Sequence, residues 1–497
     1  MPGEHPLERK AGCGPGTCRH RQFRPHVEKV PIKSVSEVAA RRIALTVAAA
    51  FFMETLDATI IVTALPAIAG ALGVPTLDAS LTVTVYLIAM AVFVPAAGWC
   101  AERFGARRVF VAALGAFTLA SLLCGAARSI EWLVAARLLQ GSAAAFMSPV
   151  GRLVVLRETP KHRIIEALGT IVWPGLIAPV IGPALGGFIV THTSWRWIFL
   201  VNVPVGFLGM FLVFRLFPPH AAGARKPFDA RGFILTAVAV TGLLQGFTFL
   251  GEHRGGLGSA IALIAAGGIA AVAAVRHARR SASPMLDLRA FRVPTYAMAI
   301  GTAGFLARTV INASPFLLPL MFQIGFGMNP FDAGLMLLFY MAGNLAMKSI
   351  TTRILRRWGF RRVISVNGAL CAATLYAFGV LGPGVPLWVT APLLFFAGMV
   401  RSMNFTAMST LAFADVADDM RPSASALATM TQQVSLALGV ALAASILGVS
   451  KALRGAEALA LADFRAAWFF TAAVMTIATL WSLRLEHEAG HALSQRA

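Results

Sequence analysis

Charge is what this sequence has least of. Asp, Glu, Lys and Arg make up 13% of its 497 residues, roughly half their share in an ordinary soluble domain. Hydrophobic residues account for 57% of the chain, and the mean hydropathy is +0.73. A soluble fold is therefore excluded, and the sequence predicts a membrane protein with many spans.

Several catalytic and metal-binding patterns are also missing. No P-loop occurs, so ATP is not the expected energy source, and no HExxH or GxSxG motif points to a hydrolase. The five cysteines suggest no framework of disulfides, and Cys13, Cys18 and His20 lack a fourth well-spaced ligand. We therefore expect no enzyme, no cofactor and no metal site.

The net charge of +21 does not indicate nucleic-acid binding. Basic residues that contact a nucleic acid gather on one face or along one stripe. Here they occupy short segments between apolar runs about twenty residues long, which is the length of a transmembrane helix. We predict fourteen such helices, at about 43–65, 80–99, 109–127, 132–156, 166–190, 197–217, 231–250, 257–275, 295–321, 331–352, 363–381, 387–411, 423–448 and 465–484.

The distribution of charge supports this number of spans. With the N-terminus in the cytoplasm, 34 of the 43 Lys and Arg residues fall on the cytoplasmic side and six on the other. Such an asymmetry follows the positive-inside rule, and omitting one span would destroy it. The last three basic residues lie within predicted spans, at Arg137, Arg308 and Arg401.

A repeat divides the spans into two halves. Residues 103–109 (RFGARRV) follow the second span, residues 357–363 (RWGFRRV) follow the tenth, and five of the seven positions are identical. Because the copies are eight spans apart, we predict two six-helix halves with two extra helices inserted between them. The expected parts are a cytoplasmic disordered tail (1–42), the N-terminal half (43–217), the inserted helices with linkers (218–294), the C-terminal half (295–484) and a second cytoplasmic tail (485–497). Parallel halves of this kind are a transporter architecture, with the binding site where the halves meet.

Two carboxylates lie inside the first span. Glu54 and Asp57 are three residues apart, so they share one face of a helix, and ionised carboxylates are costly in hydrocarbon. Asp57 and Arg137 lie at similar depth, roughly 8–14 Å from the outer ends of their spans. An acid that alternates between an arginine neighbour and a dry site changes its proton affinity, which predicts proton coupling; the alternative is a static ion pair that locks the helices.

Five segments resemble signatures of the major facilitator superfamily and its fourteen-helix drug:proton antiporter branch. They are residues 56–66 (LDATIIVTALP), 98–108 (GWCAERFGARR), 137–141 (RLLQG), 182–187 (GPALGG) and 195–204 (WRWIFLVNVP). Within the branch, residues 322–325 (FQIG), with Met347, Lys348 and Arg308, are similar to the MdtD-type multidrug transporters. The likeness implies an alternating-access transporter with the major facilitator fold, in which a proton gradient drives export of small organic molecules or drugs.

The resemblance also assigns roles to two segments. The loop after the second span would be a cytoplasmic gate, or only a basic loop that sets topology; its residues are Gly98, Glu102, Arg103, Gly105, Arg107 and Arg108. We expect Gly98 to allow close helix approach and Gly105 a tight turn. The fifth span would carry the antiporter hinge, or ordinary helix packing, at Gly182, Pro183, Gly186 and Gly187.

The substrate stays open at this point. Glu54 suits a cation or a second proton, whereas Arg308 and Arg401, both near mid-depth, suit an anion or an acid of the other half. A drug is the first expectation and a carboxylate metabolite such as citrate the alternative; a channel or a non-transporting sensor is remote. The expected partners are the substrate, protons and the lipid bilayer, and accessory efflux proteins are left undetermined. The expected location is the bacterial inner membrane, with both termini cytoplasmic.

Overall fold

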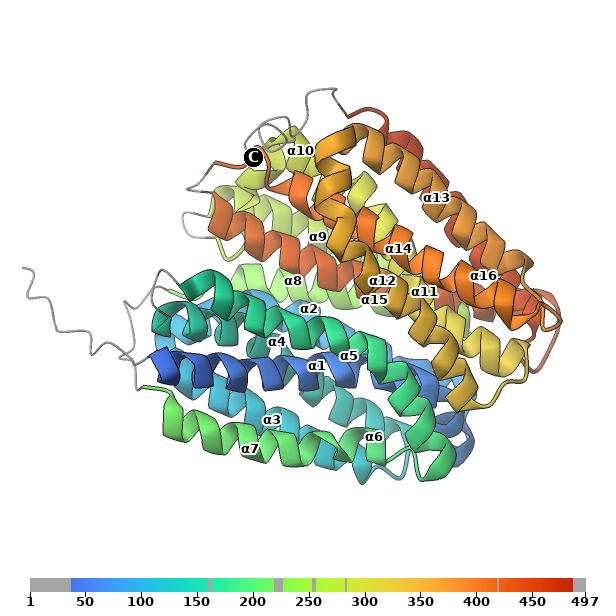
Figure 1. Ribbon diagram of the computed structural model, residues 1–497, viewed down its shortest axis with the longest axis horizontal. Helices are drawn as coiled ribbons and strands as arrows, with labels where there is room; N and C mark the ends of the chain where they lie inside the picture. Colours follow the sequence, from blue (N-terminus) through green and yellow to red (C-terminus); the bar gives the residue numbers. More distant parts are fainter. Residues whose placement is uncertain are drawn as a thin grey trace, which may run out of the picture.

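The computed structural model describes residues 37–159, 163–218, 227–252, 256–281, 284–417 and 420–485. These residues form an all-α bundle whose long helices run side by side (Figure 1). The N-terminal part consists of α1 (Glu37–Leu72), α2 (Thr76–Phe104), α3 (Ala106–Gly125), α4 (Ile130–Glu158), α5 (Ile164–His192), α6 (Trp197–Leu200) and α7 (Asn202–Leu216). Two further helices follow, α8 (Ala230–Glu252) and α9 (Gly256–Arg280).

The rest of the chain begins with a segmented span. Its pieces are the 3₁₀ turn η2 (Leu288–Arg292), α10 (Pro294–Tyr296), the π-helical η3 (Ala297–Gly301), α11 (Ala303–Leu320) and the π-helical η4 (Met321–Gly325). Five long helices complete it: α12 (Pro330–Trp358), α13 (Phe360–Val380), α14 (Leu387–Ala412), α15 (Arg421–Leu453) and α16 (Leu461–Ser482).

The predicted all-α membrane fold is confirmed. Thirteen helical segments of the described residues are long and apolar enough to cross a membrane. The fourteenth, α14, is 26 residues long, but Arg401, Asn404 and Pro392 lower its hydropathy. Each predicted span falls on one of these segments. Helix α1 begins at Glu37, before the predicted start, and the remainder of the first predicted tail, together with residues 486–497, lies outside the described residues.

The repeat seen in the sequence also appears in the coordinates. Gly105 (φ 88°) joins α2 to α3, and Gly359 (φ 73°) joins α12 to α13, so both positions use a left-handed backbone that favours glycine. The guanidinium of Arg107 donates to the carbonyl of Phe214, in the last turn of α7, at 2.8 Å. At the equivalent place Arg361 donates to the carbonyl of Leu483, just after α16, at 3.2 Å. Each half thus has an equivalent hydrogen bond, from its copy of the repeat to its last helix.

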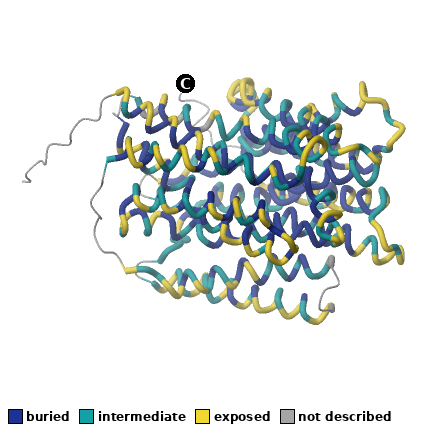
Figure 2. Tube along the Cα trace, turned by 90° about the horizontal axis from the view of Figure 1, so that it is seen from below, coloured by how far each residue is buried: buried dark blue, intermediate teal, exposed yellow. Residues whose placement is uncertain are grey.

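Helices α8 and α9 lie beside the two halves. Helix α8 packs on α2 of the first half and on α15 of the second, while α9 packs mainly on α8. Figure 2 shows the buried interior of the bundle and the exposed outer faces of its peripheral helices. Up to Val275, before the arginines at its end, the exposed side chains of α9 are apolar, as expected for a face turned toward lipid; they include Leu257, Ile261, Ile269 and Val272.

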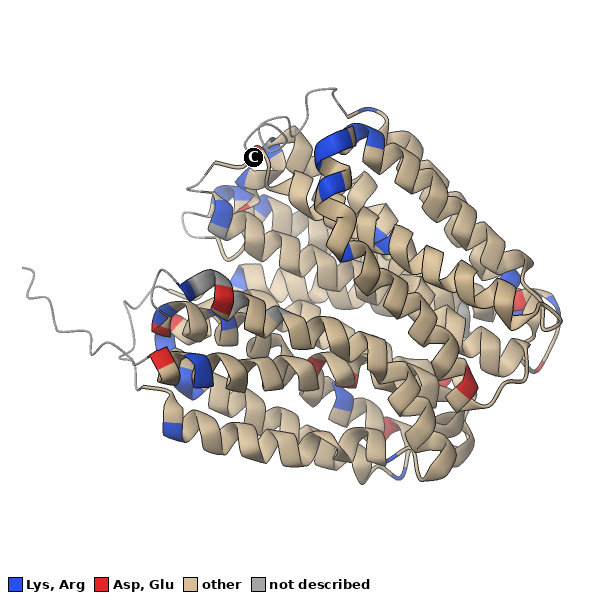
Figure 3. Ribbon diagram, in the orientation of Figure 1, with Lys and Arg blue, Asp and Glu red and all other residues tan. Residues whose placement is uncertain are grey.

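Positive charge gathers toward one end of the bundle (Figure 3). Five helices that run toward this end carry arginine in their last turn; the residues are Arg103, Arg157, Arg215, Arg280 and Arg357. We call it the basic end. Helix α12 starts at the opposite end, where Asn329 caps it by accepting from the Asp332 amide at 2.8 Å, with Pro330 in the first turn.

Candidate functional site

An ion pair lies in the interior of the N-terminal half. Arg137 of α4 donates through Nη1 to Oδ2 of Asp57 on α1 at 2.6 Å, and neither side chain has any exposed area. The predicted meeting of these two residues is therefore confirmed as a contact. A buried pair recovers its desolvation cost only when its remaining hydrogen-bonding groups are also satisfied.

Two amides supply those further hydrogen bonds. Gln140 donates to Oδ1 of Asp57 at 2.9 Å, and Asn202 of α7 donates to the same oxygen at 2.8 Å. Gln140 also accepts from Arg137 at 2.6 Å and donates to Ser121 of α3 at 2.8 Å. The carboxylate thus has three donors from two helices, and Gln140 links acid, arginine and α3 in one network.

The arginine is held by a carbonyl and two rings. Its Nε donates to the carbonyl of Thr82 on α2 at 3.1 Å. The guanidinium carbon lies 4.1 Å from the ring centre of Tyr86 and 5.7 Å from that of Phe199. Among the described residues, Arg137 Nη2 and the Tyr86 hydroxyl have no hydrogen-bond partner. These two groups are the part of the network able to accept a new partner, such as a water molecule.

Sequence reasoning missed most of the residues that contact Asp57 and Arg137. Gln140 stands three residues after Arg137, so both face the same side of α4, and that spacing was the available signal. Asn202 was a lone amide at the start of an apolar helix. Ser121, Thr82 and Tyr86 carried no signal, because small or aromatic side chains are common in membrane helices.

The second predicted carboxylate, Glu54, also faces α4. Its Oε2 accepts from the hydroxyl of Ser148 at 2.7 Å, and the residue is 7% exposed. Glu54 and Asp57 therefore both bind side chains of α4, as expected for acids on one helix face. Arg152, a turn further along α4, adds electrostatic attraction to Glu54.

The C-terminal half presents cations. Arg308 of α11 donates to the Ser409 hydroxyl of α14 at 3.3 Å and lies 5.4 Å from the ring centre of Phe405. Arg401 of α14 donates to Oδ1 of Asn312 on α11 at 3.4 Å. These side chains bridge α11 and α14 inside one half. The pairing with acids of the other half that the sequence left open is not formed by the described residues.

These cations have different exposure. Arg308 is 3% exposed, whereas Arg401 is half-buried, and Lys348 of α12 is exposed although it lies within the helical span. Lys348 is close enough to Arg401 for the two charges to repel. Exposed charges within a membrane span require contact with water or with an anion.

The predicted gate loop makes contacts inside the N-terminal half and with the following linker. Arg107 bonds to α7 as described above, and the Trp99 ring lies 4.7 Å from that of Phe228, before α8. Gly105 forms the predicted tight turn. The prediction for Gly98 is wrong, because an added Cβ there would meet no other atom within 4 Å.

The glycines of α5 lie in close helix contacts. Added Cβ atoms at Gly182 and Gly186 would collide with α1, the latter 2.5 Å from the carbonyl oxygen of Ile60. Gly187 lies against the Pro330 backbone of α12, and Gly334 of α12 lies against the Pro183 backbone of α5. The segment predicted as an antiporter hinge therefore joins α1 to α5 and one half to the other.

The two halves contact each other at the end of the bundle opposite the basic end. The interface includes the α5–α12 contact and a hydrogen bond of 3.1 Å from Gln323 of η4 to the Thr63 carbonyl of α1. The network around Asp57 lies in one half and the cations Arg308 and Arg401 in the other. Two repeated helical halves that meet around sites near the middle of the bundle are the architecture of a multi-pass membrane transporter.

Comparison with known proteins gives the family. The sequence profile of the Major Facilitator Superfamily matches residues 47–440. A protein of Serratia proteamaculans (strain 568), provisionally named multidrug resistance protein MdtD, is 40% identical over 405 residues, covering 81% of this chain and 84% of its own. A protein of the same name from Pectobacterium carotovorum subsp. carotovorum (strain PC1) is 39% identical, covering 81% and 86%. The chain belongs to the Major Facilitator Superfamily.

A solved structure agrees on the fold. The crystal structure of a D-xylose-proton symporter superposes with a TM-score of 0.63 at 14% sequence identity, covering 91% of this chain and 99% of that one. At this identity the likeness concerns the arrangement of helices only.

Proposed function

We propose that this transporter exports small organic molecules in exchange for protons by alternating access. The observation that carries the proposal is Asp57, a fully buried carboxylate in a membrane helix with three donors around it. An acid at such depth is retained for function more often than for stability, because its burial is costly. The multidrug-resistance name of the relatives supports a drug-like substrate.

The proton would load at Asp57 when its arginine partner moves. In the structure Arg137 supplies the counter-charge of this carboxylate at 2.6 Å. A shift of α4 relative to α1 removes that charge and leaves a site that favours the protonated acid. The unpartnered Nη2 and the Tyr86 hydroxyl would take up the water that delivers the proton. Glu54, bound to Ser148, would serve as a second proton site or attract a cation.

The orientation follows from charge. The basic end would face the cytoplasm, because short cytoplasmic loops hold the excess of Lys and Arg. Both termini would then be cytoplasmic, and the membrane would be the bacterial inner membrane. No bound cofactor is needed, since the potential supplies about 2.3 kcal/mol per charge per 100 mV, together with any pH difference.

A second candidate is export of a carboxylate metabolite such as citrate. Helices α11, α12 and α14 present Arg308, Lys348 and Arg401, and their only acid is Asp332, in the first turn of α12. Three cations that form no ion pair with the described residues suit an anionic substrate.

One experiment separates the candidates. Proteoliposomes that are acidic inside receive either a lipophilic cation dye or citrate, and proton efflux is recorded for wild type, Arg401→Gln and Asp57→Asn. Efflux triggered by the dye, retained in Arg401→Gln and lost in Asp57→Asn, supports drug:proton antiport. A response to citrate alone that Arg401→Gln abolishes supports metabolite export. Proton efflux undiminished in Asp57→Asn would exclude this residue from coupling.

A further inference from the structure

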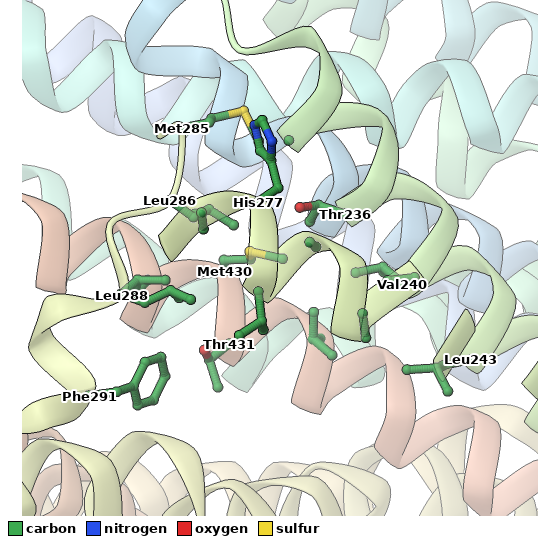
Figure 4. A pocket seen from close by; sticks show the side chains of 18 of the residues that line it. Thr236, Val240, Leu243, His277, Met285, Leu286, Leu288, Phe291, Met430 and Thr431 are labelled. Carbon is green, nitrogen blue, oxygen red and sulfur yellow. The ribbon is translucent and has the colours of Figure 1, made fainter. Parts of the chain in front are cut away.

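A second cavity lies away from the ion pair, between the inserted helices and the C-terminal half (Figure 4). Its volume is about 360 Å³, within the range of roughly 300–1,000 Å³ typical of small-ligand sites. The wall is almost entirely apolar. Val240 and Leu243 of α8, Met430 of α15 and Phe291 of η2 are among the side chains that line it.

The cavity lies beside a close contact between α8 and α9. Gly242 and Gly267 bring the two backbones together, since an added Cβ on Gly242 would lie 3.0 Å from the Gly267 Cα. Toward the basic end α9 contributes three small side chains to the wall, at Ala271, Ala274 and Ala278, together with Val275 and His277. Small residues on one wall leave space that larger ones would fill.

Asp229 fixes the mouth of the cavity at the basic end. Its carboxylate accepts from the Gly232 amide at 2.9 Å, from His277 Nε2 at 2.7 Å and from the Met285 amide at 3.1 Å. Burial acts to raise the pKa of Asp229, but these hydrogen bonds outweigh it and hold the pKa below its usual value. The start of α8, the end of α9 and the segment after α9 are therefore held around one opening.

A basic hollow adjoins the apolar cavity. It is lined by Arg279, Arg289 and Arg292, and it shares four wall residues with the cavity: Val275, Ala278, Leu288 and Phe291. Arg289 pairs with Asp287 at 2.7 Å. Arg279 is exposed and has no ion-pair partner among the described residues. The excess of positive charge next to an apolar space is suited to an amphiphile with an anionic head.

We propose that the cavity and the hollow form one binding site for an anionic phospholipid. An acyl chain occupies the apolar cavity, and the phosphate binds Arg279 and Arg292. Basic residues at this level attract anionic headgroups, and the exposed apolar face of α9 places the site beside the bilayer. A water-soluble anion would use the arginines but not the apolar cavity. The proposal does not depend on which substrate the transporter carries.

The test measures how much phosphatidylglycerol stays bound to the full-length protein. Protein is extracted from bilayers of phosphatidylethanolamine and phosphatidylglycerol, and retained lipid is counted by native mass spectrometry. The variants are Arg279→Gln with Arg292→Gln, which removes headgroup contacts, and Ala274→Phe, which fills the cavity. The matched control is Arg356→Gln with Arg357→Gln, because these arginines lie at the same end on α12. Thermal unfolding establishes that every variant is folded.

Wild type and control should retain phosphatidylglycerol in preference to phosphatidylethanolamine. Loss of two arginines should weaken retention roughly thirty-fold, given roughly five-fold per basic residue near a membrane surface. Ala274→Phe should weaken it as well. Retention by the arginine variant equal to that of the control would overturn the proposal. Unchanged retention in Ala274→Phe, or displacement of the lipid by inorganic phosphate, would show an anion site only. Proton transport is recorded separately, so a failure here leaves the proposed antiport untouched.

Discussion

The buried ion pair allows stability and proton coupling to be measured apart. Asp57→Asn keeps the size of the side chain but removes its charge, so Arg137 stays buried without a counter-charge. Breaking a buried pair in this way costs about 3–5 kcal/mol. For a half of this size that corresponds to a fall in unfolding temperature of roughly 10 °C.

The double variant gives the critical comparison. When Arg137→Gln is added to Asp57→Asn, no charge is left in the network, and Gln140 and Asn202 can still hydrogen-bond to the two amides. Because the unpaired charge is gone, most of the lost stability should return. Proton-coupled transport should not return, since no titratable group remains at this position.

The assays are thermal unfolding in detergent and proton efflux from proteoliposomes. Glu131→Gln is the control, because it removes an exposed acid from the first turn of the same helix, α4. A static ion pair that only locks helices would regain transport together with stability in the double variant. That result would refute the coupling role, and so would an Asp57→Asn protein with unchanged unfolding temperature and unchanged flux.

Two further predictions concern other parts of the molecule. Gly186→Val should separate α5 from α1, because its Cβ would lie 2.5 Å from the Ile60 carbonyl oxygen; overpacking of this kind costs about 1–3 kcal/mol, and the unfolding temperature should fall. Gly169→Val on the same helix, where an added Cβ meets nothing within 4 Å, should leave it unchanged, and an equal fall in both would contradict the reasoning. Asp463→Asn should also lower the unfolding temperature, because Asp463 forms the buried side of an ion pair with Arg454; no change on calorimetry would argue against this role.

Much of the fold was accessible from the sequence because lipid leaves few choices. An apolar run of membrane length must satisfy its own backbone, so it forms a helix, and the charges between runs give its direction. Helix edges were harder to predict. Helix α1 extends back to Glu37, beyond its apolar part, since a helix can continue into water where hydropathy gives no signal.

The site was predicted in part. Asp57 and Arg137 were found because a charge inside an apolar run is conspicuous and helix rise gives its depth. Gln140 and Asn202 were missed because a neutral amide in an apolar run is less conspicuous than a charge, and only contact between four helices gives them a role. Gly98 was assigned a close approach on sequence grounds, but which glycine meets a neighbour depends on how the helices rotate and cross.

The glycines at the junction of the halves bear on the speed of the transport cycle. At Gly187 and Gly334 the two halves meet backbone to backbone, beside the ring contacts that Phe331 of α12 makes with Phe188 and His192 of α5. Separating the surfaces at these two positions requires no side chain to leave its rotamer, so the glycines themselves add no repacking to the barrier to opening. Large side chains here would do more than weaken the closed state: they would slow each passage between the two accessible forms, and turnover would fall even where substrate and proton still bind.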